Sequence, residues 1–221
     1  MDKKTPVRLA DNASTEAPID ISTSDAPTLK AALRQQYASQ RLARPEDTRT
    51  QDDAARQERV LALLNDTFAS HTGVTVSIYL SQPPEPSTTA LAKILHETGW
   101  HVIVPSPGRD ISPWGEPAWT WYDEPTQPRP PGIPVAPDWL LQAELAAADV
   151  IIMPGLAGTR DGTRLGRGGG WYDKALMSAW DGTPRWLLLN DDEVVDELPA
   201  EPHDVTVDLI ITPSGVIVCG P

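Results

Sequence analysis

Residues 74–105 read VTVSIYLSQPPEPSTTALAKILHETGWHVIVP, and this stretch decides the fold. Its first segment, residues 74–80, alternates and is rich in β-branched side chains, which predicts a strand. A short helical pattern follows and ends at Gly99, a residue type that commonly ends helices. The apolar residues 100–105 then predict a second, buried strand. The order strand, helix, strand predicts a βαβ unit with parallel strands.

The same alternation continues toward the carboxyl end of the chain. Residues 148–154, 185–190 and 207–212 are apolar segments typical of buried strands, and a helix is predicted to begin near Gly170. Repeated alternation of strands and helices predicts an α/β fold, with three α/β/α layers around a mostly parallel central sheet. Ligands of such sheets bind beyond the carboxyl ends of the strands.

The secondary structure of the segments before residue 74 and after residue 105 is predicted from their own residue patterns. Upstream, one helix is predicted to begin with Thr28 as its N-cap, and a second to span about residues 46–68. In between the predicted strands, residues 106–137 are crowded with Pro and Gly and predict a loop. Within that loop, residues 118–122 form a candidate edge strand. The apolar face of the first helix would comprise Leu29, Ala32, Leu33 and Tyr37.

Composition limits the partners of the chain. Its 221 residues carry a formal charge of −13, which argues against duplex nucleic acid or an anionic membrane as a partner. The single cysteine, Cys219, cannot form an intramolecular disulfide, which favours a reducing cytoplasm. Residues 1–26 contain few large apolar side chains and predict a flexible acidic extension, which leaves residues 27–221 as one domain. We expect a small-molecule partner and a monomer or weak homodimer.

A glycine-rich segment leaves one predicted strand and leads into the next helix. It spans residues 153–173, MPGLAGTRDGTRLGRGGGWYD. Glycines around Arg167 let backbone amides approach a ligand, and the following helix directs its positive end at the same space. Arg164 and Arg167 add donors that suit phosphate oxygens. Taken alone, the pattern equally suits a loop that needs positive φ angles, and it lacks the Gly-Lys-Ser/Thr ending of a Walker A loop.

Four ordered motifs give this segment a more specific interpretation. RLGRGGGWYD at residues 164–173 resembles the R-L-G-x-G-x-G-Y-Y-D signature of 5-formyltetrahydrofolate cyclo-ligases, also called 5,10-methenyltetrahydrofolate synthetases, with Trp171 at a usual Tyr position. KAALR at residues 30–34, LSQPPE at residues 80–85 and EPHD at residues 201–204 resemble three other family elements, in the family's order. The resemblance covers residues 28–213.

The resemblance implies a nucleotide site made from the first helix and the glycine-rich segment. Lys30 and Arg34 would bind ATP, and their i, i+4 spacing places both cations on one helix face, although most such pairs are solvated surface charges. The glycine-rich segment would surround the phosphates. The implied ATP-binding residues are Lys30, Arg34, Arg164, Leu165, Gly166, Arg167, Gly168, Gly169, Gly170, Trp171 and Tyr172, and the catalytic residues among them are Lys30, Arg164 and Arg167.

The resemblance also implies a folate site and a metal site. Leu80 and Glu85 would contact the folate, although core packing and a surface carboxylate are the ordinary explanations for these two residue types. Asp173 and Asp204 would hold Mg²⁺, a cation that prefers carboxylates, water and phosphate oxygens. Asp173 alone is equally typical of a helix first turn, and we expect a surface or supporting role for His203. Residues that would also touch the folate are Arg167, Gly168, Gly169, Gly170 and Trp171.

The activity that the resemblance implies is an ATP-dependent ligation in folate one-carbon metabolism. Residues 27–221 would form a catalytic domain that converts 5-formyltetrahydrofolate and ATP into 5,10-methenyltetrahydrofolate, ADP and phosphate. The formyl oxygen would be phosphorylated, N10 would attack the activated carbon, and phosphate would leave. Two alternatives stay open: a catalytically silent homologue that binds folate or nucleotide, and a related ATP-dependent enzyme with a non-folate substrate.

Overall fold

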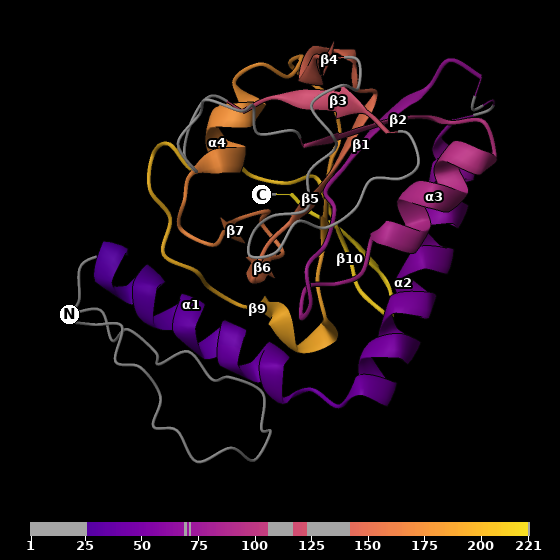
Figure 1. The fold of residues 1–221 in the computed structure, drawn as a ribbon. Helices are drawn as coiled ribbons and strands as arrows, with labels where there is room; N and C mark the ends of the chain where they lie inside the picture. Colours follow the sequence, from indigo (N-terminus) through magenta and orange to yellow (C-terminus); the bar gives the residue numbers. More distant parts are fainter. Residues whose placement is uncertain (1–25, 69, 71, 106–116, 123–141, 221) are drawn as a thin grey trace.

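The computed structural model describes residues 26–68, 70, 72–105, 117–122 and 142–220. Its centre is an eight-stranded sheet with the order β11-β10-β8-β5-β1-β2-β3-β4 (Figure 1). The five neighbouring strands from β10 to β2 are parallel, whereas β11, β3 and β4 pair antiparallel with their neighbours. The prediction of an α/β fold with a mostly parallel sheet is therefore confirmed.

Helices and strands alternate in the predicted βαβ unit, but no α-helix lies between the strands at Arg185–Leu188 and Leu209–Ile211, where the chain forms a 3₁₀ turn and a short strand instead. The helices are α1 (Ala26–Ala43), α2 (Glu46–Thr67), α3 (Thr89–Glu97) and α4 (Trp171–Leu176), with two 3₁₀ turns at Leu145–Ala147 and Asp191–Glu193. The strands of the large sheet are β1 (Thr75–Ile78), β2 (His101–Pro105), β3 (Trp119–Trp121), β4 (Gln142–Ala143), β5 (Val150–Pro154), β8 (Arg185–Leu188), β10 (Leu209–Ile211) and β11 (Val216–Val218). A second sheet contains β6 (Ala157–Thr159), β7 (Arg164–Leu165) and β9 (Val194–Val195).

Both faces of the large sheet are covered, because its central strands are apolar on both sides. Ile152 of β5 packs in the core that α2 and α3 cover, whereas its neighbour Ile151 packs in the core that α4 covers. Successive side chains of a strand point to opposite faces, so an uninterrupted apolar run fills both cores. Figure 1 shows α2 and α3 together on one side of the sheet and the shorter α4 on the other. No helix among the described residues is long and apolar enough to cross a membrane.

Two local predictions are wrong. Helix α1 begins at Ala26, so Thr28 lies inside the first turn and is not the N-cap. Pro27 is compatible with this start, because the first turn of a helix has backbone N–H groups without intrahelical partners. The candidate edge strand, observed as β3, lies between β2 and β4, so β4 forms that edge. Residues 1–25, 106–116 and 123–141 lie outside the described residues, and so do the predictions made for them.

Helix α1 packs against the small sheet. Tyr37 is buried there with Leu156, Leu165 and Leu198, in a third apolar cluster. Figure 1 shows α1 running alongside β9 and β7, separate from α2 and α3. The small sheet therefore places α1 beside the segment that follows β7, which is the glycine-rich turn.

The titration of Tyr37 provides a test of this packing. Burial, followed by the charges of Glu193 and Asp192, raises the pKa of Tyr37 to about 12. An unfolded Tyr titrates near pH 10. Because the folded pKa is the higher one, the stabilising contribution is complete below pH 10 and is lost as the pH rises toward 12. The free energy of unfolding, measured with urea, should fall more over this range for the wild type than for Tyr37→Phe, and identical pH dependences would contradict the burial.

Candidate active site

The segments that carry the predicted site leave the sheet at one edge. Strands β1, β5 and β8 are parallel neighbours, so their carboxyl ends lie together. Leu80 and Glu85 follow β1, and Gly155 follows β5 directly. This edge is the place where ligands bind in open α/β sheets.

The glycine-rich segment contains a hairpin followed by a turn. Strands β6 and β7 pair antiparallel, and residues 166–170 then lead into α4. Gly168 and Gly170 have φ angles of 98° and 62°, and Gly170 is the N-cap of α4. These angles lie in the left-handed region, which glycine adopts without a steric cost. The turn therefore requires glycine at these two positions.

The turn contacts the cationic face of α1. Arg34 Nε donates a hydrogen bond of 3.0 Å to the carbonyl oxygen of Gly166. A Cβ atom added at Gly168 would lie 3.2 Å from the Arg34 guanidinium carbon, so the guanidinium lies directly against the turn. The structure thus brings together the first helix and the glycine-rich segment, which are more than a hundred residues apart in the sequence.

Gly168→Ala should disturb both features of this contact. The substitution places a side chain at a φ of 98° and within 3.2 Å of Arg34, so we expect a loss of about 1–3 kcal/mol in the free energy of unfolding. Gly215→Ala is the matched control, because no heavy atom lies within 4 Å of its added Cβ. Urea denaturation measures both variants. Equal stability of the two would show that the turn at Gly168 is not constrained.

Lys30 lies between two carboxylates and not in open solvent. Its Nζ atom is 2.7 Å from Glu201 Oε2 and 2.6 Å from Asp204 Oδ2, and the residue is 4% exposed. Burial by itself lowers the pKa of Lys30, but the hydrogen bonds and charges of Asp204 and Glu201 outweigh burial, so the pKa is raised. Burial alone would raise the pKa of Asp204, yet the bonds from Lys30 and the Glu201 amide lower it. Lys30 and Asp204 are therefore both charged at neutral pH.

The other predicted cations are also paired with predicted acidic residues. Arg164 Nη2 donates to Asp173 Oδ1 at 2.8 Å, and its side chain is buried beneath the turn. Arg167 Nε lies 3.3 Å from Glu85 Oε1. The Arg167 side chain is 50% exposed whereas that of Glu85 is 7% exposed, so the cation reaches outward from a buried carboxylate. Leu80 is buried in the apolar core, the ordinary position for a leucine.

Aromatic residues line the side of the turn that faces the large sheet. The rings of Trp171 and Tyr172 contact each other and Trp119, with centroids 4.9–6.3 Å apart. Burial and then the charge of Glu85 raise the pKa of Tyr172 well above its ordinary value. Within the described part of the chain, the Tyr172 hydroxyl and the Trp119 indole nitrogen are buried without a hydrogen-bond partner. Buried polar atoms of this kind usually have one, and a bound ligand is one way to supply it.

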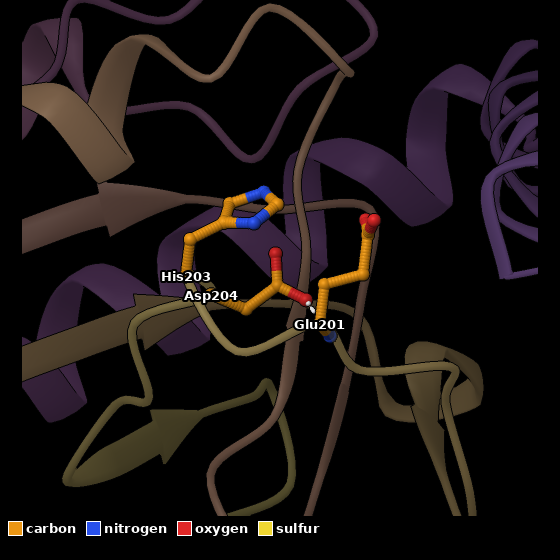
Figure 2. A group of neighbouring side chains, drawn as sticks. All are labelled: Glu201, His203 and Asp204. Carbon is orange, nitrogen blue, oxygen red and sulfur yellow. Dashed lines mark hydrogen bonds between the residues drawn. The ribbon is translucent and has the colours of Figure 1, made fainter.

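The residues that suit a metal ion form a cluster at the end of the EPHD motif. Ligand atoms of Glu201, His203 and Asp204 lie within 4.8 Å of one another, and Figure 2 shows Asp204 between the other two. Carboxylate oxygens are the donors that Mg²⁺ prefers, so the chemistry of Asp204 and Glu201 fits that ion. Asp173 is outside this cluster and accepts a hydrogen bond from Arg164. The pairing of Asp173 with Asp204 at one ion therefore stays a prediction.

Sequence analysis missed the contact that fixes α1. Arg41 donates to both oxygens of Glu193, at 2.6 and 2.7 Å, and to the carbonyl oxygen of Gly155 at 2.6 Å. Asn190 donates a further bond to Glu193. One signal was available: residues 30, 34, 37 and 41 recur every three or four positions, so they lie on one face of a helix. Three cations and one tyrosine on such a face indicate a functional face.

The fold and the site together define an α/β protein with a cationic, glycine-lined turn suited to an anionic ligand. The family described as "5-formyltetrahydrofolate cyclo-ligase family" has a model that matches residues 27–213. The chain belongs to the 5-formyltetrahydrofolate cyclo-ligase family.

Individual relatives agree with this assignment. A 5-formyltetrahydrofolate cyclo-ligase of Mycolicibacterium smegmatis is 38% identical over 154 residues, which cover 66% of this chain and 77% of that protein. A 5,10-methenyltetrahydrofolate synthetase of Mycoplasma pneumoniae has a TM-score of 0.64 at 22% identity, covering 83% of this chain and 98% of that one. The synthetase of Aquifex aeolicus has a TM-score of 0.68 at 21% identity, covering 86% and 92%. At such identities, the two structures show the shared fold.

Proposed function

We propose that this chain is a 5-formyltetrahydrofolate cyclo-ligase that uses ATP and Mg²⁺. It would convert 5-formyltetrahydrofolate and ATP into 5,10-methenyltetrahydrofolate, ADP and phosphate. The observation that carries the proposal is the contact between Arg34 and Gly166, since it joins the two segments proposed to bind one triphosphate. Family membership supports the choice of folate as substrate.

The chemistry requires activation of an amide. The formyl oxygen on N5 is a poor leaving group, so we propose that it attacks the γ-phosphate of ATP and becomes a phosphate ester. N10 then attacks the activated carbon, the five-membered ring closes, and phosphate leaves with the original formyl oxygen. No covalent intermediate with the protein is needed. Catalysis would come from alignment of the formyl oxygen and γ-phosphate, and from stabilisation of the developing charge.

The residues of the turn have distinct roles in this proposal. The exposed Arg167 side chain would contact the transferred phosphoryl group, because it can leave Glu85 without disturbing the core. Arg164 is held by Asp173 beneath the turn and would contact the phosphates from below. Backbone amides of residues 166–170 would donate to phosphate oxygens, and Arg34 would position the turn through Gly166. The cations of this site would exchange their present carboxylate and carbonyl partners for the tetra-anionic nucleotide, and Mg²⁺ would neutralise part of the remaining negative charge.

Folate would occupy the aromatic side of the turn. Glu85, Trp171 and Tyr172 lie there, and the buried Tyr172 hydroxyl has no hydrogen-bond partner among the described residues. Leu80 would contact the folate from the core. Magnesium, which would neutralise phosphate charge, suits the carboxylate of Asp204, with Asp173 as the second proposed ligand.

Product formation tests the proposal directly. Incubation of the purified chain with 5-formyltetrahydrofolate, ATP and Mg²⁺ should raise the near-ultraviolet absorbance of the methenyl product. Omission of any one component should abolish the change. A chain that binds both ligands but forms no product would be the catalytically silent homologue, and ATP consumption only with another substrate would indicate the non-folate alternative. A cytoplasmic location and a monomeric or weakly dimeric state stay predictions.

A further inference from the structure

The ammonium of Lys30 already occupies the carboxylates that suit the metal ion. It is bound to Glu201 and Asp204 at 2.7 and 2.6 Å, and the Glu201 backbone amide donates to the same Asp204 oxygen at 2.7 Å. These two carboxylates are two of the three members of the metal-suited cluster in Figure 2. Lys30 is also one of the two α1 cations proposed to bind the triphosphate. Its ammonium cannot be bound to these carboxylates and to the triphosphate in the same way at the same time.

The two carboxylates of this cluster cannot neutralise both the Lys30 ammonium and a divalent metal ion. Two carboxylates carry two negative charges, and Lys30 neutralises one of them. A dication added beside the ammonium would be repelled by it at short range, in a partly buried position where screening by water is reduced. An incoming triphosphate changes this balance, because it supplies a new anionic partner for the ammonium.

We propose that Lys30 and the divalent metal ion compete for the carboxylates of Glu201 and Asp204. When metal and nucleotide arrive together, the metal takes the carboxylate of Asp204, and Lys30 exchanges the carboxylates for the triphosphate. This inference rests on the proposed function. It gives Glu201 a role as a positioning residue, which holds the ammonium beside Asp204 while the nucleotide site is empty.

The structure allows this exchange without movement of the helix. Arg41 fixes α1 through Glu193 and Gly155, and Arg34 fixes it against the turn. The lysine side chain has a flexible four-carbon stem, so its ammonium can move while the backbone stays in place. Glu201 and Asp204 lie in the segment between β9 and β10, outside any helix or strand. The nucleotide-free protein should therefore bind a divalent metal weakly, and nucleotide should strengthen that binding.

Lys30→Met tests the competition without any catalytic turnover. Electron paramagnetic resonance of Mn²⁺, a probe for hard divalent cations, measures binding in the absence of nucleotide. Removal of the competing ammonium should tighten Mn²⁺ binding at least about tenfold. Adding Asp204→Asn to Lys30→Met should remove this gain. Lys93→Met is the charge-matched control, because Lys93 is an exposed lysine on α3, and its Mn²⁺ affinity should stay within about twofold of the wild type.

A second measurement uses the unaltered protein, in case Lys30→Met does not fold. Acetylation of lysines by an acetyl ester, quantified by mass spectrometry, should be slow at Lys30 while it is buried between its carboxylates. Mg²⁺ at a concentration that saturates the nucleotide-free protein should raise the labelling rate of Lys30 but not that of Lys93. Unchanged labelling, or an Mn²⁺ affinity of Lys30→Met no tighter than that of the wild type, would overturn the competition. The methenyl product assay reports separately on the proposed function.

Discussion

Arg167→Ala is expected to lower kcat by about 100- to 1000-fold, the usual loss when one preorganised donor to a transition-state charge is removed. Arg167 is an exposed cation of the glycine-rich turn, and among the described residues Glu85 is its ion-pair partner, at 3.3 Å. It is therefore free to reach the phosphoryl group during transfer. Because the interaction strengthens as charge develops, kcat should fall far more than KM rises.

Stability measurements separate this effect from misfolding. The Arg167 side chain is half exposed, and the Glu85 carboxylate keeps its hydrogen bond from the Gln82 amide, so Arg167→Ala should lose far less stability than Arg41→Met. Arg160→Ala is the matched control, since Arg160 is an exposed arginine in the turn between β6 and β7 and has no proposed role. Full activity of a correctly folded Arg167→Ala would remove this residue from the catalytic site.

Arg41→Met is expected to cause the largest loss of stability, about 3–5 kcal/mol in the free energy of unfolding. The variant keeps an apolar stem but leaves the buried carboxylate of Glu193 without its cation. Arg41 and Glu193 are 3% and 2% exposed, so water cannot replace the lost partner. The carbonyl oxygen of Gly155 loses a hydrogen bond as well. Because Arg41 fixes α1 beside the turn, nucleotide binding should weaken in the same variant.

A second substitution tests the cause of this loss. Arg41→Met combined with Glu193→Gln should recover part of the stability, because the unpaired buried charge is gone. Arg160→Met should change the unfolding free energy by no more than about 0.5 kcal/mol, as surface substitutions usually do. Guanidinium denaturation of the four proteins gives the comparison. A loss below about 1 kcal/mol for Arg41→Met would contradict the anchoring role of this ion pair.

The parallel strands of the central sheet could be predicted because the pattern that identifies each of them is local, whereas the short strands β4 and β11 were not predicted. Strands such as β5 are continuous apolar runs, and each is flanked in the sequence by residue patterns typical of turns or helices. The small sheet could not be predicted, since β6 and β7 contain only three and two residues and include glycine and arginine. Segments this short have no periodicity, and their pairing depends on the surrounding structure.

The site could be predicted in its parts but not in its pairings. The glycines of residues 166–170 and the cations of α1 are visible as motifs. Their neighbours are not, because Arg41 and Glu193 are 152 positions apart and Lys30 and Asp204 are 174 apart. Sequence periodicity does not report such distant contacts. The structure adds that each predicted cation already has an acidic or carbonyl partner, which ligands would have to replace.

Transfer of the formyl oxygen tests the account most directly. 5-Formyltetrahydrofolate labelled with ¹⁸O in its formyl group would be incubated with ATP, Mg²⁺ and the wild-type chain, and the released phosphate analysed by mass spectrometry. Each methenyl product formed should be accompanied by one phosphate that carries one ¹⁸O atom. Methenyl product accompanied by unlabelled phosphate would contradict this transfer.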